Sequence, residues 1–309
     1  MKKFIKKTIL ISLPIIFIGM FIKIFISYYP NTFNTKANYL NSNLENIEIL
    51  FLGSSHTQNG VNPKFIDISS ANIAYGSQDY QLNSAIYFKY ISRLKKLKKL
   101  IIELDYHSLE QKNNADYFRL PWYYKYHDIN LGDFKPYNKI SLFLSNPDFF
   151  KNYLIRKLNP QTKKFTINKF GFVENDFGIF EKFNFDKVTI AETALTRLKN
   201  RHNSVSIANF DVNKEILELI LDDCIAKNIE VIILKTPQYL TYRNNYNKDK
   251  LERRRILLDS LLSIGEIKVL DFETDVRFNV KDFKNDDHLN SKGAEKLSKL
   301  INEEINTWR

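Results

Sequence analysis

The chain has 309 residues, of which 44% are hydrophobic, 14% aromatic and 26% charged. This length and composition are typical of a globular protein with one large domain. With only 9 Gly and 8 Pro, the collagen-like and disordered classes are excluded. Cys224 is the only cysteine, which excludes an intramolecular disulfide and a cysteine-rich zinc site.

The net charge is +11 at neutral pH and is unevenly distributed along the chain. Five lysines and no acidic residue lie among the first 29 residues, which leaves +6 for the remainder. An excess of this size suits an anionic membrane surface or a polyanionic glycan. No nucleic-acid-binding motif accompanies it, so we expect no nucleic-acid partner.

Residues 1–29 are predicted to form a membrane anchor. The apolar run Thr8–Tyr29, interrupted only by Lys23, matches the roughly 20 residues that cross a bilayer as a helix. Lysines precede it, so the positive-inside rule predicts a single-pass protein of the bacterial cytoplasmic membrane, with its N-terminus inside and residues 30–309 outside. The alternative is a cleavable signal peptide, whose apolar core is typically about 7–15 residues and ends at small residues. Residues 30–46 are polar and rich in asparagine, which indicates a short tether.

Residues 47–309 are predicted to form an α/β domain, built on a doubly wound, flavodoxin-like parallel sheet of five strands. Short apolar runs alternate there with stretches of helical period. Several runs are almost entirely Ile, Leu, Val and Phe, which is typical of strands buried on both faces. The expected strands are 47–52, 72–74, 100–104, 229–234 and 267–272.

Residues 105–212 interrupt this alternation and are predicted to form an insertion. A segment of this length between regular elements is usually functional, for example as a lid. Its aromatic side chains either form a wall for a sugar or acyl group or simply make the core of the insertion. They are Tyr117, Phe118, Trp122, Tyr123, Tyr124, Tyr126, Phe134, Tyr137, Phe149, Phe150 and Tyr153.

The first candidate motif is Gly53-Ser54-Ser55, directly after the first predicted strand. Glycine permits a sharp turn there, and ligands of open α/β sheets bind at this carboxyl edge. A serine in the turn can act as a nucleophile while backbone N–H groups face the developing oxyanion. Taken alone, the motif also fits an ordinary polar turn.

The second candidate motif is Asn285-Asp286-Asp287-His288, just before the last predicted helix. A histidine beside carboxylates suits a general base that one of those acids orients. The alternative is an acidic loop in which Asn290 or Ser291 caps the helix. The order of the two motifs along the chain favours a catalytic site over two ordinary polar loops, with Ser55 and His288 as the reacting pair.

Together the motifs resemble the SGNH (GDSL-like) hydrolase and acyltransferase superfamily, whose first block is Gly-Asp-Ser after strand one and whose last is Asp-x-x-His. They look closest to its membrane-anchored branch, around the D-alanyl transfer proteins of teichoic acid and the alginate acetyltransferases. The first block of that branch is commonly Gly-Ser/Thr-Ser. The resemblance covers about residues 47–107 and 212–305, and it implies Ser55 as the nucleophile, with Ser54 in place of the usual aspartate.

The resemblance also implies an oxyanion and pocket region. The segment Asn72–Gly76 looks like the second block, so Gly76 is expected to lend its N–H to the oxyanion, with Asn72 beside it. Glu103–Tyr106 stands in place of the Gly-x-Asn-Asp block, which puts Asp105 at the pocket and omits the usual asparagine donor. The run Thr236-Pro237-Gln238, after the fourth strand, also looks like the family.

One position departs from the family pattern. Asn285 stands three residues before His288, where an aspartate is usual. The orienting carboxylate is therefore expected to be Asp287, with Asp286 or a Ser-His dyad as alternatives. His56 adjoins the nucleophile and either lines the pocket or is structural.

Together with the predicted anchor, the resemblance implies a membrane-anchored, extracytoplasmic serine O-acyltransferase or esterase that acts on cell-envelope polysaccharide through an acyl-enzyme on Ser55. Acetyl is the commonest acyl group in similar proteins. The expected partners are a cell-envelope glycan or lipid-linked saccharide and a multi-pass membrane acyltransferase. No cofactor and no metal are expected, because no set of ligands has metal spacing. The alternative is a non-catalytic module of the same fold that binds glycan or recruits an acyltransferase. The acyl donor, the acceptor and the oligomeric state are left open.

Overall fold

The computed structural model describes residues 1–309 except 29–30, 115–116, 133–165, 177, 265–266 and 309. The chain divides into two compact units. One unit comprises residues 1–31 and 116–163, and the other comprises 32–115 and 164–309. The second unit carries both candidate motifs.

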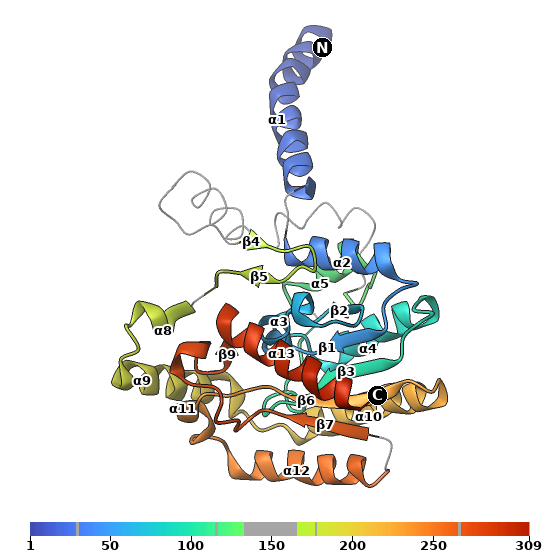
Figure 1. The fold of residues 1–309 in the computed structure, drawn as a ribbon. Coiled ribbons are helices and arrows are strands. Elements are labelled where there is room, and N and C mark those ends of the chain that lie inside the picture. Colours follow the sequence, from blue (N-terminus) through green and yellow to red (C-terminus); the bar gives the residue numbers. More distant parts are fainter. Residues whose placement is uncertain (29–30, 115–116, 133–165, 177, 265–266, 309) are drawn as a thin grey trace. The chain divides into compact units, whose positions relative to one another are not determined.

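Five parallel strands form the centre of the second unit, as the sequence predicts (Figure 1). Their order is β2-β1-β3-β6-β7, and every neighbouring pair is parallel. This is the flavodoxin-like order, in which the chain reverses direction between β1 and β3 and ligands bind outside the carboxyl ends of those strands. The strands are β1 (Ile49–Leu52), β2 (Ser70–Asn72), β3 (Lys99–Glu103), β6 (Glu230–Lys235) and β7 (Ile267–Asp271).

One face of the sheet packs against the last helix, α13 (Ser291–Thr307). Phe51 and Ile101 lie in register on neighbouring strands and share one apolar core with Leu297 and Ile301 of that helix. Successive strand residues point to opposite faces, so the residues between them need a second cover. The almost continuous apolar runs in the sequence reflect this burial on both sides.

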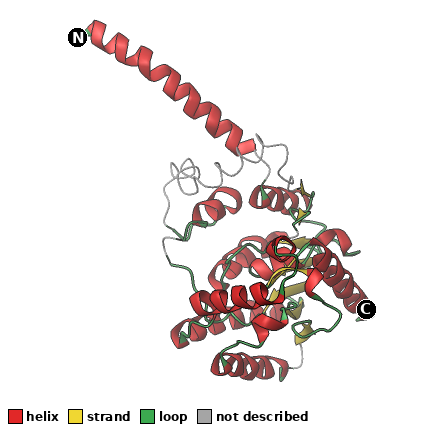
Figure 2. Cartoon of the chain, turned by 90° about the vertical axis from the view of Figure 1, so that its left-hand side faces the viewer, coloured by secondary structure: helices red, strands yellow, loops and turns green. Residues whose placement is uncertain are grey.

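The other face is covered by the crossover helices. Right-handed crossovers place α4 (Tyr80–Tyr90), α10 (Ile207–Ala226) and α12 (Lys248–Leu262) on the same side of the sheet. α10 packs against both α4 and β6, and α12 packs against β7. Figure 2 shows the yellow strands enclosed between red helices.

Residues 30–46 differ from the predicted tether. They contain the helix α2 (Thr32–Asn43), which packs against β2. The ring of Phe33 stacks on that of Tyr75, with centroids 3.8 Å apart. The many asparagines make the segment look polar, but its buried residues recur every three or four positions, as on one face of a helix. Its members are Phe33, Lys36, Ala37 and Leu40.

The helix α1 (Lys2–Tyr28) belongs to the first unit. Over Lys3–Phe21 it is long and apolar enough to cross a membrane, and none of that window is buried. A membrane span and a signal sequence near the N-terminus both satisfy this test.

The predicted insertion is described in part. In the first unit, α5 (Leu120–His127) buries Trp122, Tyr123 and Tyr124. These side chains thus belong to a core, whereas the role of the insertion as a lid or aromatic wall stays a prediction. Five of its aromatic residues lie outside the described residues, namely Phe134, Tyr137, Phe149, Phe150 and Tyr153.

The second unit holds the rest of the insertion, and α10 begins inside its predicted range. Its elements are β4 (Thr166–Ile167), β5 (Val173–Glu174), α8 (Gly178–Lys182), α9 (Lys187–Arg197) and the π-helical turn η4 (Leu198–His202). The other short elements of the described chain are η1 (Pro63–Phe65), η2 (Ile91–Arg93), α11 (Leu240–Arg243) and η5 (Val280–Asp282), with α3, β8 and β9 placed below.

Candidate active site

The turn after β1 is fastened to the end of β3 by one carboxylate. Glu103, the last residue of β3, accepts the backbone N–H groups of Ser54 and Thr57, each at 2.9 Å. It also accepts their hydroxyl groups, at 2.6 Å and 2.8 Å. A Cβ on Gly53 would lie 2.7 Å from side-chain atoms of Glu103. Glycine is therefore required at this position, because the carboxylate approaches the backbone so closely.

This turn gives the two serines different environments. Ser54 is buried and caps the helix α3 (Ser55–Gly60), and its hydroxyl also lies 3.1 Å from Nε2 of His107. Ser54, which was predicted to line the pocket, is therefore fixed inside the fold. Ser55 begins the helix and is only partly buried. Of the pair, Ser55 is the one that a substrate can reach more readily.

The second motif lies on a small antiparallel hairpin of β8 (Phe283–Asn285) and β9 (His288–Leu289). Nδ1 of His288 lies 2.8 Å from Oδ1 of Asp287 and 3.0 Å from Oδ1 of Asn285. Both groups thus hold the same ring nitrogen, which leaves Nε2 for proton transfer. Asn285 does what an amide can do at the usual acid position, because it orients the ring without supplying charge.

Asp286 and Asp287 point to different surroundings. Asp286 accepts the hydroxyl groups of Thr193 at 2.9 Å and Thr241 at 3.2 Å. Asp287 is the acid at His288. Both acids lie in the two-residue turn between β8 and β9, and their side chains leave that turn toward different partners, so only one of them reaches the ring.

The two motifs meet where α3 packs against β9. The ring of His56 lies edge-on to that of His288, with centroids 5.0 Å apart and an interplanar angle of 88°. Because His56 directly follows Ser55, this contact brings the predicted nucleophile and base to the same corner of the second unit. Proton transfer between Ser55 and His288 stays a prediction.

Asp105 lies behind this corner and is fully buried. Its Oδ2 is 2.6 Å from Nδ1 of His56, and its Oδ1 accepts the backbone N–H of Thr236 at 2.8 Å. The amide nitrogen of Gln238 lies 3.0 Å from the same ring nitrogen of His56. Asp105, predicted to lie at the pocket, thus contacts His56 instead of an open surface.

Asn72 is also fastened within the fold. Its amide nitrogen donates to the backbone oxygens of Thr57 at 2.9 Å and Val61 at 2.7 Å, and its Oδ1 accepts the N–H of Ala74 at 3.0 Å. Asn72 therefore connects β2 to α3 and shapes the loop toward Gly76. Gly76 is partly buried, and its role as an oxyanion donor stays a prediction.

Four of the five histidines of the chain gather at this corner. Ring centroids are 4.3 Å apart for His56 and His107, and 4.8 Å apart for His107 and His202. They come from α3, the loop after β3, η4 and β9, so no local sequence pattern unites them. The only available signal is scarcity, since a chain with 5 histidines uses four of them in one place.

Burial and charge separate the pKa values of the site. Burial lowers the pKa of His288 to about 4, although Asp287 acts in the opposite direction. Burial also disfavours a charged His56, but Asp105 and Asp287 outweigh it and raise the pKa of His56 to about 10. Despite burial, His288 and His56 hold the pKa of Asp287 well below its usual range. At neutral pH the site therefore has an ionised acid, a protonated His56 and a neutral His288, the form that a general base requires.

Two triplets of described residues place possible metal ligands within 4.8 Å of one another. They are His56, Asp287 and His288, and His56, Glu103 and His107. In the second triplet, Glu103 already accepts four hydrogen bonds from the turn after β1. The expectation that the site works without a metal stays a prediction.

No family model matches the sequence, and no curated protein matches it. Among solved structures, the chain is similar to a GDSL-like lipase from Bacteroides thetaiotaomicron, with 10% identity and a TM-score of 0.41 over 90% of this chain and 100% of that chain. It is also similar to the lipase/acylhydrolase from Enterococcus faecalis, with 12% identity and a TM-score of 0.40 over 85% of this chain and 97% of that chain. Similarities at this level do not assign a family, and the fold class rests on the strand order itself.

Proposed function

We propose that this chain is a membrane-anchored serine esterase or O-acyltransferase that acts on cell-envelope polysaccharide. The observation that carries the proposal is the Asp287–His288 pair, at 2.8 Å, on the hairpin that packs against the helix beginning at Ser55. An acid that holds one imidazole nitrogen is the arrangement that makes a histidine a general base toward a nearby hydroxyl. The position after β1, at the reversal of strand order, is where open α/β sheets bind ligands.

In the first half of the reaction, Nε2 of His288 takes the hydroxyl proton of Ser55 while Oγ attacks the carbonyl carbon of an ester. The N–H groups of Ser55 and Gly76 hold the negative oxygen, and a single donor of this kind is typically worth about 3 kcal/mol. The ester C–O bond then breaks, and His288 returns the proton to the departing alcohol. The acyl group remains on Ser55.

In the second half, His288 takes a proton from an acceptor hydroxyl while its oxygen attacks the acyl carbon. The bond between that carbon and Oγ of Ser55 then breaks, and His288 returns the proton to Oγ. A sugar hydroxyl as acceptor makes the enzyme an O-acyltransferase, and water makes it an esterase. The apolar helix α1 supports the proposal that the chain is anchored in the membrane. An anchored enzyme favours a surface glycan or lipid-linked saccharide as the substrate.

A fluorophosphonate probe tests the chemistry, because it labels only a working serine nucleophile. We expect the full chain to be labelled and Ser55→Ala to remain unlabelled. The matched control is Ser54→Ala, which removes the neighbouring buried hydroxyl and should still be labelled if it folds. A folded wild-type chain that resists labelling would favour a glycan-binding module or an acyltransferase partner on the same fold.

A reporter fusion tests the location. If the lysines before α1 stay in the cytoplasm, a C-terminal alkaline phosphatase fusion is active and remains with the membrane fraction. Release of active reporter into the medium would indicate a cleaved signal peptide. An inactive reporter would exclude an extracytoplasmic site.

A further inference from the structure

The ring of His56 lies between two buried carboxylates from distant parts of the chain. Its Nδ1 is 2.6 Å from Oδ2 of Asp105, and its Nε2 is 3.5 Å from Oδ2 of Asp287. The side chains are 1% exposed for His56 and 0% for both acids. A neutral imidazole has one N–H and can donate toward only one of these acids, whereas the protonated ring donates toward both.

Both acids need a compensating charge, because a buried carboxylate without a partner is strongly unfavourable. Asp105 also accepts the backbone N–H and the hydroxyl of Thr236 and the amide N–H of Gln238. Asp287 faces imidazole rings: that of His288 at 2.8 Å, that of His56 at 3.5 Å and that of His202 at 3.8 Å. Since His288 must be neutral to act as a base, the positive charge beside Asp287 belongs on His56.

Among the described residues, the other titratable groups around His56 are acidic, neutral or farther from Asp287 than the 3.5 Å of His56, as His202 is at 3.8 Å. Glu103 is anchored to the turn after β1, and burial holds the pKa of His107 well below its usual value, so that ring stays neutral. His202 directs Nδ1 to the hydroxyl of Tyr242. Lys284, a cation that acts on the pKa of His288, pairs with Asp176 at 2.8 Å. The groups that face His56 are thus Glu103, Asp105, His107, His202, Asp287 and His288.

We propose that His56 is a positioning residue of this site, a protonated imidazole that bridges Asp105 and Asp287 and thereby keeps Asp287 ionised and directed at His288. The inference rests on the proposed function, because it concerns the base of that reaction. It lengthens the acid–base pair into a chain of four groups that runs from Asp105 to His288. It also explains how Asp287 can serve as the acid of His288. The usual position of that acid, three residues before the histidine, is occupied by Asn285.

The variant His56→Gln removes the charge and keeps a polar side chain. Without that charge, one of the two neighbouring carboxylates becomes protonated. Asp105 retains its hydrogen bonds from Thr236, so we expect the proton on Asp287. We expect kcat/KM to fall about 10- to 100-fold. Metal sites typically lose this much when a residue that hydrogen-bonds to a metal ligand, and so orients it, is removed. The acidic limb of the pH profile moves to higher pH, because Asp287 must lose a proton before it can support His288.

The double variant His56→Gln/Asp105→Asn removes the cation together with one of the two anions. The net charge of the corner is then that of the wild type and Asp105 no longer adds a second anion, so part of the loss in kcat/KM is recovered. The control is His127→Gln, which removes a buried imidazole of α5 and leaves the acidic limb where it is. An equal loss at every pH, with no recovery in the double variant, would reduce His56 to a packing residue and overturn the inference.

A second measurement does not depend on turnover. The ring-nitrogen shifts of His56, followed by NMR in the inactive Ser55→Ala variant, report its protonation directly. We expect an imidazolium at neutral pH that becomes a neutral ring in Asp105→Asn/Asp287→Asn. A neutral His56 overturns the inference even if the serine is labelled by the fluorophosphonate. A protonated His56 in a chain that resists the probe overturns the proposed function and leaves the charge assignment intact.

Discussion

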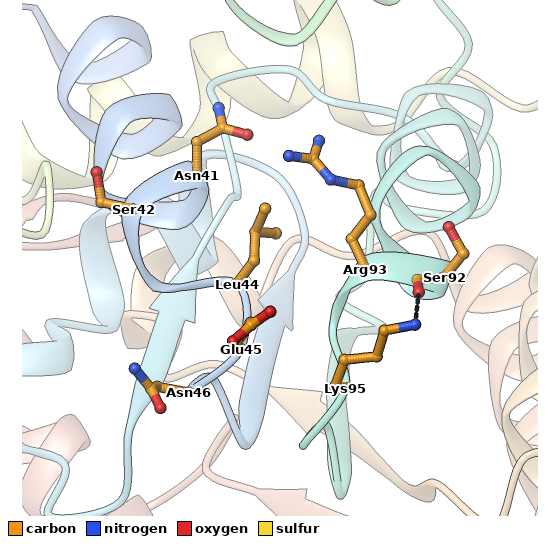
Figure 3. Close-up of a pocket in the computed structure, with 8 residues that line it drawn as sticks. All are labelled: Asn41, Ser42, Leu44, Glu45, Asn46, Ser92, Arg93 and Lys95. Atoms are coloured by element: carbon orange, nitrogen blue, oxygen red, sulfur yellow. Dashed lines mark hydrogen bonds between the residues drawn. The ribbon is translucent and has the colours of Figure 1, made fainter.

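The charged side chains at the two edges of the sheet differ in their exposure to water. At the amino edge, Lys98 pairs with Glu48 at 2.6 Å, with side chains 70% and 30% exposed. A polar groove lies there, between the start of β1 and the start of β3 (Figure 3). It is lined by Asn41, Ser42, Leu44, Glu45, Asn46, Ser92, Arg93 and Lys95. Pairs this exposed are screened by water and typically contribute about 0–1 kcal/mol.

At the carboxyl edge, the acids are buried and share their partners. Glu103, Asp105 and Asp287 have side chains no more than 1% exposed, and each contacts an imidazole or a backbone N–H. With water excluded, every charge there shifts the pKa of its neighbours. Burial, more than the number of charged residues, therefore distinguishes an edge that can control proton transfer from a solvated one.

The largest effect is expected at the reacting pair. His288→Asn removes the proposed base, and kcat should fall about 10⁴- to 10⁶-fold, as in serine hydrolases that lose a member of the triad. Turnover of p-nitrophenyl acetate provides the measurement. If His288→Asn and wild type turn over alike, the carboxyl edge is not catalytic and the contrast between the edges has no functional meaning.

The two adjacent aspartates should differ next. Asp287→Asn is expected to lower kcat by about 10⁴-fold, the usual cost of losing the orienting acid of a Ser-His-Asp triad. Asp286→Asn should leave kcat nearly unchanged in the same assay, because that side chain contacts Thr193 and Thr241. Equal small losses in both variants would indicate a Ser-His dyad.

Stability gives a direct comparison of the edges. Glu103→Gln keeps the shape but places an amide among four donors, so the free energy of unfolding should fall by about 3 kcal/mol. Glu48→Gln at the amino edge should change it by less than about 1 kcal/mol. Urea denaturation measures both variants. Similar losses would contradict the assignment of Glu103 as the anchor of the serine turn.

The pH profile should reflect the neutral base. Because the pKa of His288 is lowered to about 4, the active, unprotonated form persists as the pH falls and is lost only near that value. The acidic limb of kcat/KM should therefore lie well below the roughly 6.5 of an ordinary imidazole. A limb near the ordinary value would mean that water reaches His288 during turnover.

The smallest effect is expected from metal removal. The ligand atoms of His56, Asp287 and His288 lie close enough for an ion, but the reaction proposed here uses them as bridge, acid and base. Dialysis against EDTA should leave kcat unchanged. A loss that zinc restores would instead assign the corner to a metal, and the charge chain through His56 would have to be abandoned.

The amino-acid sequence was enough to predict the five-stranded sheet, and it suggested where a site would lie. Continuous apolar runs predicted the five strands within two residues at each end, since buried parallel strands allow few polar residues. The glycine and serines after the first strand and the histidine before the last helix indicated the sheet edge at which we propose that the reaction takes place. The helix at 32–43 was missed because asparagines hide its buried face.

Which polar groups share that edge depends on the tertiary structure. Asp286 and Asp287 are indistinguishable as neighbours in sequence, and the hairpin turns one to threonines and the other to His288. His56 acquires its two acids from the loop after β3 and from the C-terminal hairpin. Such contacts depend on how separate loops meet in space, and the pKa values follow from burial and nearby charge, neither of which local sequence encodes.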